Sequence, residues 1–138
     1  MTHNLILYIQ NLTDAWNSHD LEVVLPYYAE NYEGVDLGEP RVQHGRNAVK
    51  EMLLRYWQAF PDLHFTVQNT VAEENRIAIS WCAEGTHQGQ IMHIPPTGHK
   101  IQIRGVSIID VKDGLVMRGE YIWDLAGMLR HMGLLPEL

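Results

Sequence analysis

The sequence is short of cysteine and of basic residues, and each shortage argues against a class of protein. Its 138 residues include one cysteine, Cys82, so no internal disulfide can form. Cys82 lies in an alternating apolar stretch, which indicates an inert buried thiol rather than a nucleophile. Ten Lys and Arg stand against seventeen Asp and Glu, giving a net charge of -7. Because phosphate groups bind to basic surfaces, neither nucleic acid nor an anionic membrane is expected as a partner.

Export signals and cofactor motifs are also missing. The N-terminal stretch MTHNLILYIQ has no basic segment and no long apolar core, which favours the cytoplasm. The chain contains no P-loop, GxGxxG, HExxH, CxxC or GxSxG motif. His87, His93 and His99 recur every six residues, but this spacing crosses a Pro-Pro loop and does not aim three imidazoles at one point. We therefore expect neither a metal nor a cofactor.

The most regular stretch runs from Lys100 to Asp124 and predicts a long β-hairpin. Two runs of alternating residues flank a turn at Lys112, Asp113 and Gly114, where Asp-Gly supplies the positive dihedral angles that a tight hairpin needs. Both faces of the hairpin carry apolar residues. We therefore expect one face to pack on helices or a cavity, and the other on a partner or a neighbouring sheet.

Apolar residues recur at helical spacing in three segments before the strands. Residues 3–17 predict an amphipathic helix. A second, short helix should begin after Asp20 and be kinked by Pro26. A third helix is expected to end at Phe60, because Pro61 follows it.

Alternating stretches predict further strands. A brief strand is expected from Asn31 to Leu37, followed by the loop Gly38-Glu39-Pro40. Two more strands are expected over residues 63–71 and 77–83. After the hairpin, a short helix is expected from Leu125 to Leu135.

This order of elements predicts an α+β fold in one domain of residues 1–138. Three N-terminal helices should pack on one face of a curved antiparallel sheet, with a short helix at the C-terminus. A sheet bent around helices encloses a pocket, and such a pocket is the default place for a functional site.

Asp36 and His87 are candidate acid/base residues. Asp36 ends a short strand, where a desolvated carboxylate could take a proton from carbon, although it could equally be a solvated residue at the strand end. His87 continues the alternation that contains Trp81, so it could donate to a developing oxyanion or lie in solvent beside the next turn.

Ser107 and Tyr121 lie on matching faces of the hairpin among apolar residues. Hydroxyl groups in an apolar wall orient a ligand through a few hydrogen bonds, and a tyrosine hydroxyl can stabilise an enolate. Alternatively, both residues could have a purely structural role. Asp124 is a rival base, although it is also placed to cap the C-terminal helix. Four tryptophans could line a cavity for a flat hydrophobic ligand or serve as core: Trp16, Trp57, Trp81 and Trp123.

Several stretches together resemble a known family. These are AWNSHDLEVVLPYYAENY, HGRNAVKEML, FPDLHFTVQNTVAEENRIAISWCAEGTHQGQ and IPPTGHKIQIRGVSIIDVKDGLVMRGEYIWD. Over nearly the whole chain they resemble the SnoaL-like polyketide cyclases of the NTF2-like superfamily. The resemblance implies a cone-shaped α+β fold, a hydrophobic pocket, no cofactor, and a homodimer formed through the sheet.

The resemblance also bears on the candidate residues. Asp36 matches the position of the proton-abstracting aspartate of the ketosteroid isomerases. The cyclases carry an acidic residue where Tyr121 stands and a histidine near Ser107, so this chain departs from them at both positions. A shift of the match by one or two residues would bring Asp124 into the acidic position.

The resemblance implies a cofactor-free cyclase or isomerase acting on a small hydrophobic carbonyl compound. Asp36 or Asp124 would be the base, and Tyr121 and His87 would hold the enolate oxygen. A non-catalytic protein that binds or senses a small molecule in the same cone is the alternative. A hydrolytic relative would need two carboxylates and an arginine to converge, whereas Arg104 is expected to face the other way.

Overall fold

The computed structural model describes residues 2–36 and 41–137. It contains α1 (Thr2–Asn17), α2 (Leu21–Val24), one turn of 3₁₀ helix (Leu25–Tyr27), β1 (Tyr28–Asp36), β2 (Gln43–His44), α3 (Gly45–Ala59), β3 (His64–Glu73), β4 (Arg76–Thr86), β5 (Lys100–Lys112), β6 (Leu115–Trp123) and α4 (Leu125–His131). Leu37 and the predicted loop Gly38-Glu39-Pro40 lie outside the described residues.

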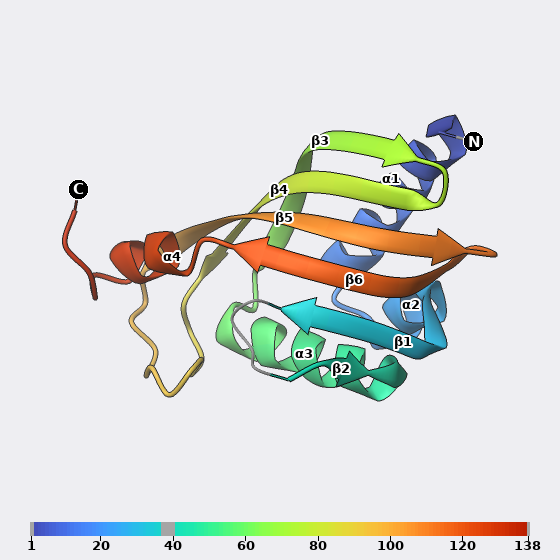
Figure 1. Ribbon diagram of the computed structural model, residues 1–138. Helices are drawn as coiled ribbons and strands as arrows, with labels where there is room; N and C mark the ends of the chain where they lie inside the picture. The colour runs from blue at the N-terminus through green and yellow to red at the C-terminus, as the bar shows by residue number, and fades with distance from the viewer. Residues whose placement is uncertain (1, 37–40, 138) are drawn as a thin grey trace.

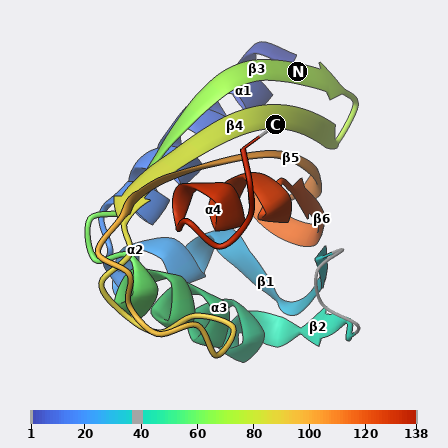
Figure 2. The ribbon, with the colours of Figure 1, turned by 90° about the vertical axis from the view of Figure 1, so that its left-hand side faces the viewer.

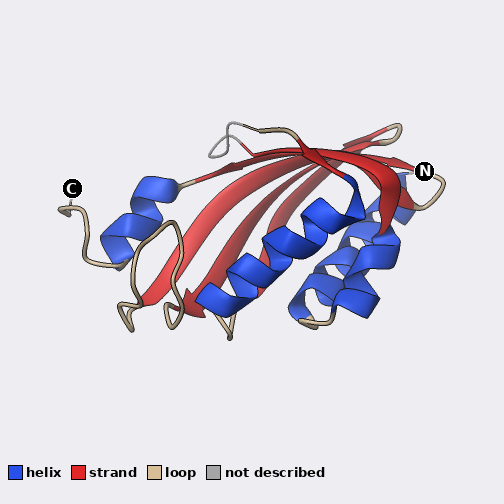
Figure 3. Ribbon diagram, turned by 90° about the horizontal axis from the view of Figure 1, so that it is seen from below, coloured by secondary structure: helices blue, strands red, loops and turns tan. Residues whose placement is uncertain are grey.

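The six strands form one curved sheet in the order β2-β1-β6-β5-β4-β3, with α1, α2 and α3 on its concave face (Figures 1 and 3). The predicted hairpin is confirmed as β5 and β6. Its turn places Asp113 and Gly114 at φ angles of 53° and 76°, as a tight hairpin requires. None of the described helices is long and apolar enough to span a membrane.

The sheet is mixed, whereas we predicted an antiparallel one. The antiparallel expectation holds for β3 to β6, but β1 runs parallel to β6, with Asp36 opposite Tyr121. Alternation reveals which residues share a face of a strand, and it carries no information about strand direction. The parallel pairing joins segments more than eighty residues apart, which no local pattern reports.

Three boundaries also differ from the prediction. Pro26 does not merely kink the second helix, since α2 ends at Val24 and a 3₁₀ turn follows. β1 then begins at Tyr28, three residues before the predicted strand. α4 ends at His131 rather than at Leu135, although Asp124 caps it as expected, with Oδ1 accepting the Gly127 N–H at 2.9 Å.

The core consists of two packed clusters. One joins α1, α2 and α3 to the sheet through Ile9, Val24, Tyr32, Leu53 and Val116. The other joins the end of α3, the start of β3 and α4 through residues such as Phe60 and Met128. α4 lies across the open end of the curved sheet (Figure 2).

The loop after β4 is tied to the end of α3, and this contact leads to a prediction. The N–H groups of Gln88 and Gly89 both donate to the Ala59 carbonyl, at 2.9 and 3.1 Å. A Cβ at Gly89 would lie 2.1 Å from the Gln58 carbonyl oxygen, so the backbone at Gly89 or at Gln58 would have to move.

Gly89→Ala should lower the free energy of unfolding by about 1–3 kcal/mol in urea denaturation. Gln88→Ala, with an exposed side chain, is the control and should stay within about 0.5 kcal/mol of wild type; equal stabilities of the two variants would contradict this account.

Candidate active site

Strand register brings five of the candidate positions into two adjacent rows across the concave face. Ile79 on β4 lies opposite Ser107 on β5, Ser107 opposite Tyr121 on β6, and Tyr121 opposite Asp36 on β1. The neighbouring row runs from Trp81 through Gly105 to Trp123. Because side chains of paired residues share a face, the register alone places Ser107, Tyr121 and Asp36 side by side.

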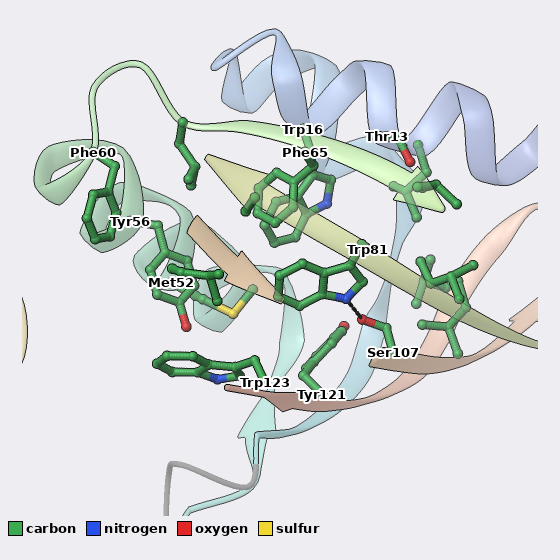
Figure 4. A pocket seen from close by; sticks show the side chains of 18 of the residues that line it. Thr13, Trp16, Met52, Tyr56, Phe60, Phe65, Trp81, Ser107, Tyr121 and Trp123 are labelled. Atoms are coloured by element: carbon green, nitrogen blue, oxygen red, sulfur yellow. Dashed lines mark hydrogen bonds between the residues drawn. The ribbon is translucent and has the colours of Figure 1, made fainter. Parts of the chain in front are cut away.

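A cavity of about 120 Å³ lies over these rows, between the two core clusters (Figure 4). Its walls are almost entirely apolar, and none of the described residues that line it carries a charged side chain. An engineered apolar cavity of about 150 Å³ binds benzene, so this space suits a group the size of a single ring. The lining includes five candidate residues from the sequence, which are Trp16, Trp81, Trp123, Ser107 and Tyr121.

Two hydroxyl groups of the wall are held as acceptors by tryptophans. Trp16 Nε1 donates to the Tyr28 hydroxyl, and Trp81 Nε1 donates to Ser107 Oγ, both at 2.9 Å (Figure 4 shows the second bond). Indole can only donate, so each hydroxyl keeps its own proton for another acceptor. Tyr28 and Ser107 are 2% and 6% exposed and line the cavity. Since a buried donor left unpaired is unfavourable, the cavity favours a ligand with acceptor oxygens.

Asp36 is buried directly behind the cavity wall. Its two carboxylate oxygens accept the Trp123 Nε1 proton at 3.0 and 3.2 Å. Trp123 lines the cavity, whereas Asp36, 4% exposed, does not. The carboxylate therefore contacts the cavity wall through the Trp123 indole N–H.

Tyr121 is paired with a second tyrosine. Its hydroxyl lies 2.5 Å from the Tyr32 hydroxyl, and either group can be the donor. When Tyr32 donates, the Tyr121 proton is available to a ligand. Burial, followed by the proximity of Tyr32, raises the pKa of Tyr121 well above its usual range, so the hydroxyl stays a neutral donor near neutral pH.

Three predicted site residues lie away from this cluster. His87 is fully buried rather than solvated, and its Nδ1 lies 2.9 Å from Thr97 Oγ1 and accepts the Thr97 N–H. Burial lowers its pKa, and it does not line the cavity. Asp124 is exposed and caps α4, while Trp57 stacks on His19 outside the cavity.

No three His, Cys, Asp or Glu side chains are grouped to hold a metal ion within residues 2–36 and 41–137. The metal-free interpretation of the histidines remains a prediction. Among the described residues, the polar groups at the cavity are hydroxyls and indole N–H groups, which are poor ligands for the metals that histidine and cysteine bind.

Sequence reasoning missed Tyr28 and Tyr32. Tyr28 falls on the apolar face of the segment that we predicted as the second helix. We therefore did not predict that it begins a strand. Tyr32 lies in the predicted strand, but its contact with Tyr121 depends on the pairing of β1 with β6, which shifts register between Tyr28 and Glu33 and is not visible in the local sequence.

The buried tyrosines should be visible in a pH titration. Burial raises the pKa of Tyr8 to about 12, and it raises those of Tyr28, Tyr32 and Tyr121 as well. Their neutral forms favour the folded state, so the contribution of these tyrosines to stability should be fully present below about pH 10 and should be lost as the pH rises through the folded pKa values. Phenolate absorbance at alkaline pH should therefore rise in two phases, the second coinciding with unfolding. A single phase near pH 10 from all six tyrosines of a folded protein would contradict the burial.

Comparison with other proteins agrees with this fold. The sequence pattern of the SnoaL-like polyketide cyclases matches residues 6–132, although no curated protein matches the sequence. AclR of Streptomyces galilaeus, assigned as a hydroxylase, is 24% identical with a TM-score of 0.88, over 100% of this chain and 90% of that one. IdmH of Streptomyces antibioticus, assigned as a polyketide cyclase, is 26% identical with a TM-score of 0.80, over 91% and 96%.

A third structure, assigned as a SnoaL-like polyketide cyclase of Jannaschia sp. CCS1, is 17% identical with a TM-score of 0.86, over 98% of this chain and 95% of that one. Similarity at such identities establishes the fold, which is the NTF2-like cone, and the family match supports a cyclase-like role. The family pattern covers both core clusters and every strand that contributes to the cavity. The chain belongs to the SnoaL-like polyketide cyclase family.

Proposed function

We propose that the protein is a cofactor-free cyclase or isomerase that acts by acid/base chemistry on a small hydrophobic carbonyl compound. The observation that carries the proposal is the pair of buried hydroxyl donors, Tyr28 and Ser107, in an almost entirely apolar cavity beside a buried carboxylate. A carbonyl oxygen satisfies these donors, and hydrogen bonds to it strengthen as an enolate forms.

Asp36 would act as the base. Its carboxylate would take a proton from the carbon next to the carbonyl, the C–H electrons would form a C=C bond, and the carbonyl electrons would move to the oxygen held by the hydroxyls. In a cyclase the enolate carbon attacks a second carbonyl of the same molecule, and in an isomerase the proton returns to another conjugated carbon. Because Trp123 covers Asp36, a rotation of the Trp123 side chain belongs to the proposal.

His87 and Asp124 have no role in this proposal. We predicted that Tyr121 and His87 would hold the enolate oxygen. In this proposal Tyr121, Ser107 and Tyr28 hold it instead. The second candidate function is non-catalytic binding in the same cavity. It is favoured by one observation, which is that no carboxylate from residues 2–36 and 41–137 lines the cavity.

Exchange of α-protons separates the two functions. Acetophenone carries one ring and one carbonyl, and its methyl protons exchange with D₂O through the enolate. The protein should accelerate this exchange by roughly tenfold or more over buffer, as followed by ¹H NMR. Saturable binding of acetophenone without acceleration would favour the binding function.

We also propose that two copies pair through the convex face of the sheet. All helices that cover the sheet lie on the other face (Figure 3). Val106 and Ile122, opposite each other in register, are 40% and 45% exposed, while nearby charges pair within the chain, as Arg76 does with Asp110. A second copy offers the same apolar strip. Light scattering after size exclusion should give a dimer for wild type and a monomer for Val106→Arg; a wild-type monomer would contradict the pairing.

A further inference from the structure

The indole ring of Trp81 packs against the backbone of Gly105, which has no side chain. The two residues are opposite each other in the pairing of β4 and β5. A Cβ at Gly105 would lie 2.3 Å from Trp81 Cζ2 and 2.6 Å from Cη2, far closer than carbon atoms approach each other. The ring therefore lies across β5 at Gly105, where the strand has no side chain.

Trp81 is held in that position from two sides. Its Nε1 donates to Ser107 at 2.9 Å, and its ring meets Phe65 edge to face, with centroids 5.5 Å apart. A methyl group at position 105 would have to lift the ring off the sheet, and the space above the sheet is the cavity. Lifting the ring would also draw Nε1 away from Ser107.

In β6, the next strand of the sheet, a glycine again makes room for an aromatic side chain. A Cβ at Gly119 would collide with the hydroxyl of Tyr121, which likewise lines the cavity. Ile103 and Ile109 on the same face of β5 carry full side chains and line the cavity beside the aromatic rings. Glycine at positions 105 and 119 thus lets an aromatic ring of the cavity wall lie close to the sheet.

We propose that Gly105 is a specificity-determining residue, because it sets how far Trp81 projects into the cavity and so how wide a ligand can be. The inference rests on the proposed function, in that it takes this cavity as the ligand site. With Trp81 lying against Gly105, the cavity of about 120 Å³ accepts a single ring rather than two fused rings.

A pair of ketones that differ by one fused ring tests the inference. Acetophenone and 2-acetonaphthone are titrated against each protein by ligand-observed NMR, and the ratio of their dissociation constants is the readout. Wild type should prefer acetophenone. Trp81→Phe, which shortens the projecting ring, should raise the affinity for 2-acetonaphthone by about tenfold relative to acetophenone.

Gly105→Ala should do the opposite and lower the affinity for acetophenone by about tenfold. The double variant, Gly105→Ala with Trp81→Phe, should recover acetophenone binding to within about threefold of wild type, because the smaller ring leaves room for the methyl group. If Gly105→Ala does not fold, Trp81→Phe alone decides the question. An unchanged ratio of dissociation constants in Trp81→Phe would overturn the proposal.

Failure here and failure of the proposed chemistry give different results. This experiment measures only the selectivity of binding, whereas the exchange experiment measures proton transfer. Size selectivity without α-proton exchange would leave Gly105 as the determinant of a binding cavity. Exchange with an unchanged size ratio would leave the chemistry in place and remove the role of Gly105.

Discussion

Replacing Asp36 with asparagine is expected to lower the α-proton exchange of acetophenone by about 10²- to 10⁴-fold. Asparagine has nearly the shape of aspartate, and its carbonyl oxygen can still accept the Trp123 N–H. It cannot take a proton from carbon. Since Asp36 does not line the cavity, the dissociation constant of acetophenone should change by less than about threefold. Exchange is followed by ¹H NMR in D₂O, and binding is measured by titration.

Asp124→Asn is the matched control for this prediction. Asparagine is as good a helix N-cap as aspartate, so the bond to the Gly127 N–H and the helix α4 should be kept. Exchange should stay within about twofold of wild type, because Asp124 is exposed and does not line the cavity. Loss of exchange in Asp124→Asn, with full exchange in Asp36→Asn, would make Asp124 the base.

The largest effect on stability is expected at Leu53, where α3 packs on the sheet. Leu53 is fully buried in the first core cluster, while its neighbour Leu54 is 39% exposed. Truncating a buried leucine loses its transfer free energy and leaves a cavity. Leu53→Ala should therefore lower the free energy of unfolding by about 2–5 kcal/mol.

Leu54→Ala makes the same chemical change one residue later on the same helix, so the pair removes any effect of helix propensity. Its loss should stay below about 1 kcal/mol, because much of the side chain already lies in solvent. Both values come from urea denaturation at equal protein concentration. Equal losses, or a larger loss in Leu54→Ala, would mean that α3 presents a different face to the sheet.

The hairpin of β5 and β6 shows which parts of the fold the sequence predicts. Its strands alternate over long runs and its turn requires Asp-Gly, so the faces and the turn position follow from local rules. The alternation placed Ser107 and Tyr121 on matching faces of the hairpin and left a structural role open for both, and both line the cavity. The three N-terminal helices follow in the same way from apolar spacing.

Features that depend on distant segments were not predictable in this way. The direction of β1 follows from its pairing with β6, and that pairing also places Asp36 beside Tyr121 and Trp123. Tyr28 was hidden because a 3₁₀ turn and a register shift interrupt the alternation before Glu33. His87 follows the alternation of β4, but the strand ends at Thr86, and the loop then turns the ring toward Thr97 instead of the cavity.

The central claim is that the Ser107 and Tyr28 hydroxyls hold a ligand carbonyl inside an apolar cavity. The carbonyl stretching band of bound acetophenone tests this most directly, because hydrogen bonding to the oxygen lowers the frequency. In wild type the band should lie below its position in hexane, and it should return toward that position when Ser107→Ala and Tyr28→Phe are combined. A band of bound acetophenone at the hexane frequency in wild type would contradict the claim.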